Sequence, residues 1–180
     1  MGLFGNLHNQ AKAAEPPKEK RFEFAAIPAD LAEFTSLEQA AMKTPFETAA
    51  MTVIALCAYP QNNEHSIKML NFLRGPRPLN GAEIGFIDDR FRSCDYIPRS
   101  YLSGATPKNE YLPDKPYTVT VFDDFSSYQE KGYARLFIRS GGADTPREVV
   151  TRQAKDGKWY LWDHALLVKV SQPDSSDFWA

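Results

Sequence analysis

The chain has 180 residues with 43% hydrophobic and 24% charged side chains, the composition of an ordinary globular domain. Its formal net charge of −2 argues against nucleic acid as the main partner, because phosphate neutralisation needs concentrated Lys and Arg. No apolar run approaches the roughly 20 residues that span a bilayer, and Met1–Leu7 is too short and too weakly charged for a secretory signal. We therefore expect no membrane span and a cytoplasmic location.

Residues 1–21 are expected to form a flexible tail ahead of a single domain over residues 22–180. The segment Glu15–Arg21 is polar and interrupted by prolines, so it cannot bury enough apolar surface to become ordered. A few apolar residues near the start leave open a second interpretation, in which the tail is a docking peptide.

Everything between this tail and residue 95 is predicted to be helical. The strongest start signal is Thr44-Pro45-Phe46-Glu47, in which Thr44 is the N-cap, Pro45 takes the first helical position and Glu47 completes a capping box. The segment Ala49–Tyr59 that follows is apolar almost all round. It predicts a helix buried at the centre of the core.

Three further helices are predicted around this one. Asp30 can cap a short helix before it. A helix over residues 63–74 ends at Gly75, which supplies a left-handed C-cap. Asn80, with Glu83 three residues later, starts a last helix.

The second half of the chain predicts an antiparallel sheet. A connector over residues 95–116 is rich in Pro and Tyr, and the tyrosines indicate that it is held against the core. Alternating segments then predict strands, and Asp156-Gly157 predicts a tight hairpin. The expected strands are residues 117–121, 133–139, 147–154, 158–163 and 165–170. The fold class is therefore α+β, with N-terminal helices packed on a C-terminal four- or five-stranded antiparallel sheet.

Four arginines form the candidate site, an anion-binding face. Side chains alternate along a strand, so Arg135 and Arg139 share one face. Arg147 and Arg152 follow on the next strand, and residues 131–170 carry eight basic and four acidic side chains. Arg139 and Arg147 flank the intervening turn, and we expect them to converge on one carboxylate or phosphate. The alternative is that all four are solvated surface arginines.

No motif for catalysis, metal binding or cofactor binding accompanies this face. Cys57 lies in an apolar run and is expected to be buried, whereas Cys94 has no thiolate-stabilising neighbour in the sequence. The three histidines are scattered, without the spacing of metal ligands. Ser140–Pro146 lacks the Lys and Ser/Thr of a phosphate-binding loop and is better interpreted as a hairpin turn. We therefore expect no catalytic residue, no metal and no cofactor.

Five segments of the chain are specific when taken together: Met69–Leu79, Ser100–Pro107, Lys115–Val119, Ser140–Arg147 and Asp177–Ala180. With them the chain resembles an uncharacterised family of bacterial proteins, a domain of unknown function, over roughly residues 22–180. The resemblance implies a bacterial, cytoplasmic, single-domain protein and brings no activity or site residue with it. The order of helices before a sheet with a Trp-bearing hairpin is also similar to the cone-shaped folds of nuclear-transport-factor-like proteins.

The leading hypothesis for function is a non-enzymatic binding or protein-interaction domain. The alternative is a small-molecule enzyme or binder whose pocket opens between the helices and the sheet. The partner would be a protein or a small anionic ligand. The sequence identifies neither, and it leaves the oligomeric state open.

Overall fold

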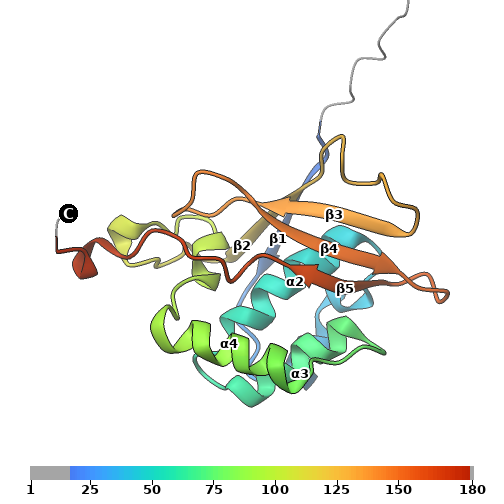
Figure 1. Cartoon of the computed structure of the whole chain (residues 1–180), viewed down its shortest axis with the longest axis horizontal. Helices are drawn as coiled ribbons and strands as arrows, with labels where there is room; N and C mark the ends of the chain where they lie inside the picture. The colour runs from blue at the N-terminus through green and yellow to red at the C-terminus, as the bar shows by residue number, and fades with distance from the viewer. Residues whose placement is uncertain (1–16, 179–180) are drawn as a thin grey trace, which may run out of the picture.

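A computed structural model describes residues 17–178, which form one sheet with helices against one of its faces (Figure 1). The elements, in chain order, are β1 (Glu19–Phe24), α1 (Leu31–Ser36), α2 (Pro45–Cys57), α3 (Asn63–Arg74), α4 (Gly81–Ser93), β2 (Tyr117–Phe122), β3 (Tyr133–Ile138), β4 (Arg147–Gln153) and β5 (Trp159–His164). Helices are mostly N-terminal and strands mostly C-terminal, which confirms the predicted α+β class.

The five strands pair antiparallel in the order β1-β2-β3-β4-β5, so β1 and β5 are the edges of the sheet. β1 corrects two expectations, the tail over residues 1–21 and the wholly helical first half, because Glu19–Phe24 pairs with β2 along its whole length. The segment is polar because one side of an edge strand faces solvent, while Phe24 on the other side is buried. Residues 1–16 of the expected tail lie outside the described part of the chain.

α2 is the central helix, and its predicted start is confirmed. Thr44 Oγ1 accepts the Glu47 backbone N–H at 3.3 Å, and the Glu47 carboxylate accepts the Thr44 N–H at 3.1 Å. The helix is buried along nearly its whole length between the sheet and α3. The Thr48 hydroxyl donates to the Trp159 carbonyl oxygen at 2.5 Å, which joins α2 to the β5 edge.

The other three helices begin and end as their caps predict. Asp30 caps α1, Asn80 forms a capping box at the start of α4, and Gly75 ends α3 with a φ of 59°. α3 and α4 lie beyond α2 as seen from the sheet, and α3 also reaches β5 (Figure 1). Tyr59, just after α2, stacks on Phe91 of α4 with ring centroids 4.1 Å apart. No helix within residues 17–178 has both the length and the apolar character needed to cross a bilayer.

The predicted strand over residues 165–170 is wrong. The Ala165 N–H still donates to the Glu148 carbonyl oxygen at 2.9 Å, but a turn then takes the chain away from β4. Leu166 and Leu167 are both buried, although neighbouring side chains of a strand would point to opposite faces. Two consecutive apolar side chains are therefore buried by an irregular segment instead of by a strand.

The long connector between α4 and β2 is fixed to the core, as predicted. Tyr101 and Tyr111 are buried, and their hydroxyls donate to the carbonyl oxygens of Leu166 and Ser171 at 2.9 and 2.5 Å. Tyr96 stacks on Tyr111 with ring centroids 5.2 Å apart. These contacts tie the connector to the C-terminal segment that follows β5.

Candidate functional site

The four arginines of the candidate site lie on two different faces of the sheet. Arg135, Arg139 and Arg152 lie on the face without helices. Arg147 is instead the register partner of Ile138, whose side chain is buried on the helical face. Directly opposed residues of an antiparallel pair share a face, whereas consecutive residues do not. Arg139 and Arg147 therefore do not converge on one group, although they flank the same turn.

Carboxylates balance the charges of two outer-face arginines. Arg135 Nε lies 3.3 Å from a Glu148 carboxylate oxygen on β4, and Arg139 Nη1 lies 3.3 Å from Glu19 on β1. The Arg139 guanidinium also lies over the Phe122 ring, 4.2 Å from its centroid. Exposed ion pairs of this kind contribute little to stability. They do cancel the positive charge that the anion-binding hypothesis needs at these positions.

The other two arginines differ in their surroundings. Arg147 donates to the carbonyl oxygens of Thr145 and Lys169 at 2.9 and 3.3 Å, so it fastens two loops together. Arg152 lies over the Trp162 ring, 4.8 Å from its centroid. Within residues 17–178 the Arg152 guanidinium makes neither an ion pair nor a hydrogen bond. Among the described residues neither Arg147 nor Arg152 has a carboxylate partner, and of these two only Arg152 has a guanidinium that makes no hydrogen bond.

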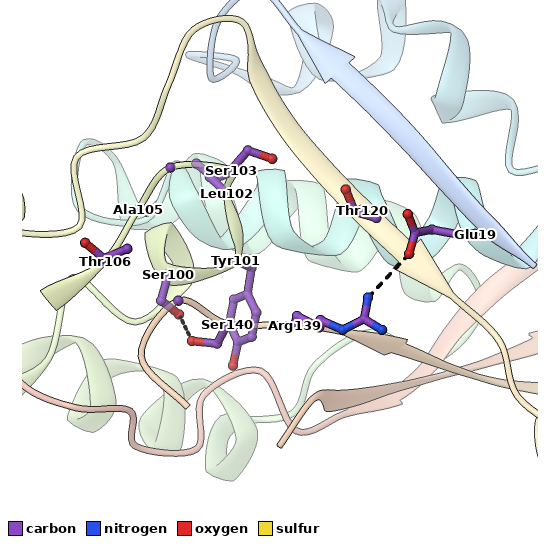
Figure 2. Close-up of a pocket in the computed structure, with 12 residues that line it drawn as sticks. Glu19, Ser100, Tyr101, Leu102, Ser103, Ala105, Thr106, Thr120, Arg139 and Ser140 are labelled. Carbon is purple, nitrogen blue, oxygen red and sulfur yellow. Dashed lines mark hydrogen bonds and ion pairs between the residues drawn. The ribbon is translucent and has the colours of Figure 1, made fainter. Parts of the chain in front are cut away.

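A cavity of about 360 Å³ opens where the sheet splits (Figure 2). β2 and β3 pair at only two positions, and beyond them residues 100–105 of the connector come between the two strands. The Ser103 N–H donates to the Thr118 carbonyl oxygen at 3.0 Å, and the Gly141 N–H donates to the Ser100 carbonyl oxygen at 2.8 Å. The connector thus replaces the missing strand pairs and leaves a hollow in which six of the twelve lining residues carry a hydroxyl group.

Two of the serine hydroxyls of this cavity, those of Ser140 and Ser100, form a chain of hydrogen bonds. The Gly142 N–H donates to Ser140 Oγ at 3.1 Å, Ser140 Oγ donates to Ser100 Oγ at 2.8 Å, and Ser100 Oγ donates to the Ile97 carbonyl oxygen at 2.6 Å. The hydroxyl protons of Ser100 and Ser140 thus already have acceptors, and no histidine lines the cavity to remove one. The ion-paired Arg139 side chain lies at one end of the cavity (Figure 2). The arrangement suits a neutral polar group rather than nucleophilic catalysis.

A second cavity, of about 300 Å³, lies between the end of α3 and the β4–β5 hairpin, and we call it the Trp162 pocket. Its lining residues are Arg74, Pro76, Arg77, Arg152, Gln153, Ala154, Lys155, Tyr160, Leu161 and Trp162. Four of these ten residues are cationic and none is acidic. The rest of the wall is mainly apolar or aromatic, so the pocket combines positive charge with hydrophobic surface.

Two guanidinium groups contact the indole ring of Trp162. Arg77 Cζ lies 3.9 Å from the ring centroid and Arg152 Cζ lies 4.8 Å from it. The Tyr133 ring meets the indole edge-on, with centroids 5.5 Å apart and an interplanar angle of 88°. The Arg77 guanidinium also donates to the Trp162 carbonyl oxygen. Since each cation–π contact is worth about 0.5–1 kcal/mol at exposed sites, these residues hold one another in position before any ligand arrives.

The turn after α3 brings two arginines to this pocket. The positive φ of Gly75 ends the helix, and a Cβ on this residue would overlap the Tyr160 ring, so glycine also lets α3 approach β5. Arg74 is only 7% exposed. Its Nε donates to the Arg77 carbonyl oxygen at 2.9 Å, and its Nη2 donates to Glu83 at 2.8 Å. Arg74 is thus a fixed and neutralised part of the wall.

The carboxylates near the pocket are engaged by other groups. The pKa of Glu83 is lowered first by a backbone N–H at the start of α4 and then by the neighbouring arginines. The pKa of Asp156 is lowered first by the backbone N–H of residue 158 and then by the Tyr160 hydroxyl, which donates to it at 2.8 Å. Within residues 17–178, Arg152 and Lys155 make no ion pair. An anionic ligand would therefore neutralise charge that the protein leaves uncompensated.

The sequence identifies one cation of this pocket, Arg152, and misses the others. Arg74 and Arg77 flank a Gly-Pro pair, which by itself reports only the end of a helix. The pocket forms because α3 and the β4–β5 hairpin, which are distant in sequence, come together in the fold. Arginines on both sides of the Gly-Pro turn, combined with a Trp-rich strand, are the signal that could have indicated it.

Two further titratable groups of the described chain, His164 and Cys57, have pKa values shifted by burial. Burial lowers the pKa of His164 to about 4, and its Nδ1 accepts the Leu166 backbone N–H at 3.3 Å. Cys57 is buried, as predicted, and burial raises the pKa of its thiol to about 12. No three His, Cys, Asp or Glu side chains within residues 17–178 are placed to hold a metal ion.

Comparison with known proteins assigns the chain to a family but gives no activity. No curated protein and no solved structure matches the chain. A family model does match, over residues 26–174, a range that includes every lining residue of the Trp162 pocket. The chain belongs to this family, which is described as a domain of unknown function (DUF6935).

Proposed function

We propose that this protein is a non-enzymatic binding domain and that its Trp162 pocket holds a small ligand with an anionic group attached to an apolar or aromatic body. One observation carries the proposal. Arg152 and Lys155, which have no carboxylate partner among residues 17–178, lie beside Trp162 in one concave site.

The chemistry of the pocket matches the two parts of such a ligand. The planar guanidinium of Arg152 and the ammonium of Lys155 suit a carboxylate or a phosphate ester. Leu161, Pro76 and the indole of Trp162 offer apolar and aromatic surface beside these charges. A flat organic acid would contact both parts at once, whereas inorganic phosphate would contact only the cations.

The lining of the Trp162 pocket favours ligand binding over catalysis. Its lining residues include no histidine, cysteine, serine or carboxylate that could act as a nucleophile or a general base at neutral pH. Tyr160, the one lining hydroxyl, donates to Asp156, and this bond raises the pKa of the phenol. Ligand capture therefore fits the pocket better than chemical transformation.

The test uses four probes of graded chemistry: benzoate, phenyl phosphate, benzyl alcohol and inorganic phosphate. Titrations are followed by the indole N–H resonance of Trp162 in ¹H–¹⁵N spectra, assigned with a Trp162→Phe variant. We expect benzoate and phenyl phosphate to shift this resonance and to bind at least about tenfold more tightly than the other two probes, a difference of about 1.4 kcal/mol. Affinity should also fall as salt is raised, because exposed charges are screened.

Substitutions distinguish binding in the Trp162 pocket from non-specific attraction of an anion by the charge of the protein surface. Arg152→Gln combined with Lys155→Gln should weaken binding by about tenfold or more, because contacts to charged groups contribute about 1.5–3 kcal/mol. The matched control is Arg92→Gln, an exposed arginine on α4 that pairs with Asp89 and does not line the pocket. Equal binding of benzyl alcohol and benzoate, or equal weakening in the control, would overturn the proposal.

We also propose that the protein works in a reducing compartment, the cytoplasm. Cys57 and Cys94 are both free thiols in the structure, which supports this location. Fractionation of cells that express the full chain, with thiol labelling of each fraction, tests the proposal. Recovery of the protein from an oxidising compartment would contradict it.

A further inference from the structure

The two edge strands of the sheet, β5 and β1, differ in the hydrogen-bond partners of their outward-facing backbone groups. On β5, the Trp159 N–H donates to the Met42 carbonyl oxygen at 2.9 Å, and the Trp159 carbonyl oxygen accepts the Thr48 hydroxyl at 2.5 Å. The Trp162 carbonyl oxygen accepts a bond from Arg77. The β5 edge is thus closed by groups of the same chain, which is how folded proteins commonly protect an edge strand.

The β1 edge is open in the described chain. The Asp123 N–H donates to the Lys18 carbonyl oxygen at 3.0 Å, and the register then continues with Glu19 opposite Phe122. Because hydrogen-bonded and non-hydrogen-bonded pairs alternate in an antiparallel ladder, even-numbered residues of β1 bond to β2 and odd-numbered ones present their N–H and C=O groups outward. Within residues 17–178, no backbone hydrogen bond reaches Arg21 or Glu23 from outside the sheet.

The side chains along this edge are self-complementary in one register. A two-fold axis perpendicular to the sheet can pair β1 antiparallel with the β1 strand of a second copy. The outer faces of the two sheets then lie on the same side, and the odd-numbered residues of the two strands form backbone hydrogen bonds with each other. When the axis passes through Phe22, Arg21 of each copy lies opposite Glu23 of the other copy, which gives two pairs of opposite charge. Centring it on Arg21 or on Glu23 instead places like charges opposite each other, and centring it on Lys20 pairs Glu19 with Arg21 but sets the two Lys20 side chains opposite each other; like charges so placed destabilise a strand pair. Only the Phe22-centred register both forms the backbone hydrogen bonds and places opposite charges, without like charges, across the strand pair.

The charges of β1 do not protect this edge from pairing in that register. Lys20, the residue type most often used to block an edge, lies on the helical face with its ammonium 5.2 Å from the centroid of the Phe46 ring. The outer-face side chains of Arg21 and Glu23 are 64% and 57% exposed, and they form an intrachain pair at 3.5 Å. Both are therefore accessible to a partner strand.

We propose that two copies of this protein associate through their β1 edges, antiparallel and centred on Phe22, to join two five-stranded sheets into one continuous sheet. Each copy gains backbone hydrogen bonds at Arg21 and Glu23 and two interchain ion pairs. Strand addition at an exposed edge is a recurrent mode of protein association. This inference is independent of the ligand proposed for the Trp162 pocket.

The experiment exploits the charge pattern. The full chain is examined by sedimentation velocity up to about 1 mM, a concentration that detects even weak association. Arg21→Glu and Glu23→Arg, each alone, should raise the dimer dissociation constant at least about tenfold, because each places like charges opposite each other. An equimolar mixture of the two variants should restore a dimer, since one chain then carries two carboxylates and the other two guanidiniums. The double variant Arg21→Glu/Glu23→Arg should also dimerise.

Controls exclude effects of folding and of the first residues. Thermal melts should show each single variant as stable as the parent, because an exposed ion pair contributes little, and Arg92→Glu on α4 should leave dimerisation unchanged. A deletion of residues 1–16 should dimerise like the full chain. The proposal is overturned if the full chain is monomeric at every concentration, if only the deleted chain dimerises, or if the mixture associates no better than either variant alone.

Discussion

The backbone of Gly141 packs directly against the backbone of Ala105, where the loop after β3 meets the connector. A Cβ on residue 141 would overlap the Ala105 carbonyl oxygen, which cannot move like the end of a flexible side chain. Gly141→Ala should therefore destabilise the protein by about 1–3 kcal/mol, the usual cost of overpacking. Urea unfolding followed by circular dichroism measures this change.

The matched control is a glycine in open space. Gly85 is an exposed residue of α4, and a Cβ there meets nothing within 4 Å. Gly85→Ala should raise stability by up to about 1 kcal/mol, because alanine favours a helix over glycine. Similar effects of the two substitutions would show that the close approach at Gly141 does not exist in solution.

The capping box of α2 gives a second prediction. Thr44→Ala removes the acceptor for the Glu47 N–H at the start of the most buried helix, and it should cost about 1 kcal/mol in the free energy of unfolding. Thr35→Ala, on the exposed part of α1, serves as the control and should change stability by less than about 0.5 kcal/mol. An unchanged urea midpoint for Thr44→Ala would count against this helix start.

The N-terminal boundary gives a third prediction. Deleting residues 1–16 leaves β1 intact, and the melting temperature should stay the same within error. Deleting residues 1–24 removes the strand together with the buried Phe24, and it should cost at least the roughly 3–5 kcal/mol typical of losing one buried Phe side chain. Differential scanning calorimetry of the two truncations distinguishes these outcomes. A large loss on deletion of residues 1–16 alone would place the boundary earlier.

His164 gives a prediction on pH. Its pKa in the folded protein is about 4, chiefly because burial disfavours the charged imidazole, and its ordinary value is 6.5. As the pH falls below 6.5 the unfolded chain takes up this proton first, so the contribution of His164 to stability is full above pH 6.5 and declines toward pH 4.

The comparison for His164 is with His164→Asn, whose side-chain oxygen can still accept the Leu166 N–H. Urea midpoints measured between pH 7 and pH 4.5 should fall more for the parent than for this variant. Parallel curves for the two proteins would mean that His164 titrates normally in the folded state.

Helix ends were predictable because the information is local. Thr44, Asn80 and Gly75 each act on backbone groups within one turn, so their spacing alone reports the helix boundary. β1 was not predictable in this way. Its polar sequence becomes a strand only because β2, from the other half of the chain, offers an edge to pair with.

The faces on which the four arginines lie were not predictable for a related reason. The face on which a strand residue lies depends on register, and a shift of one residue reverses it. Arg147 lies opposite Ile138 and not opposite Arg139, a relationship that the turn between β3 and β4 decides and that composition does not report. The Trp162 pocket needs a helix end and a hairpin together, so only the folded chain reveals it.

The pairing of β1 with β2, across the four α-helices between them in the sequence, has a consequence for biosynthesis. Glu19–Phe24 leaves the ribosome long before Tyr117–Phe122 exists, so during translation it has no neighbour with which to form a ladder. β3, β4 and β5 connect to one another through short links and can assemble locally, whereas docking β1 closes the longest loop in the sheet. We expect amide exchange during refolding to protect β3 and β4 first and β1 last.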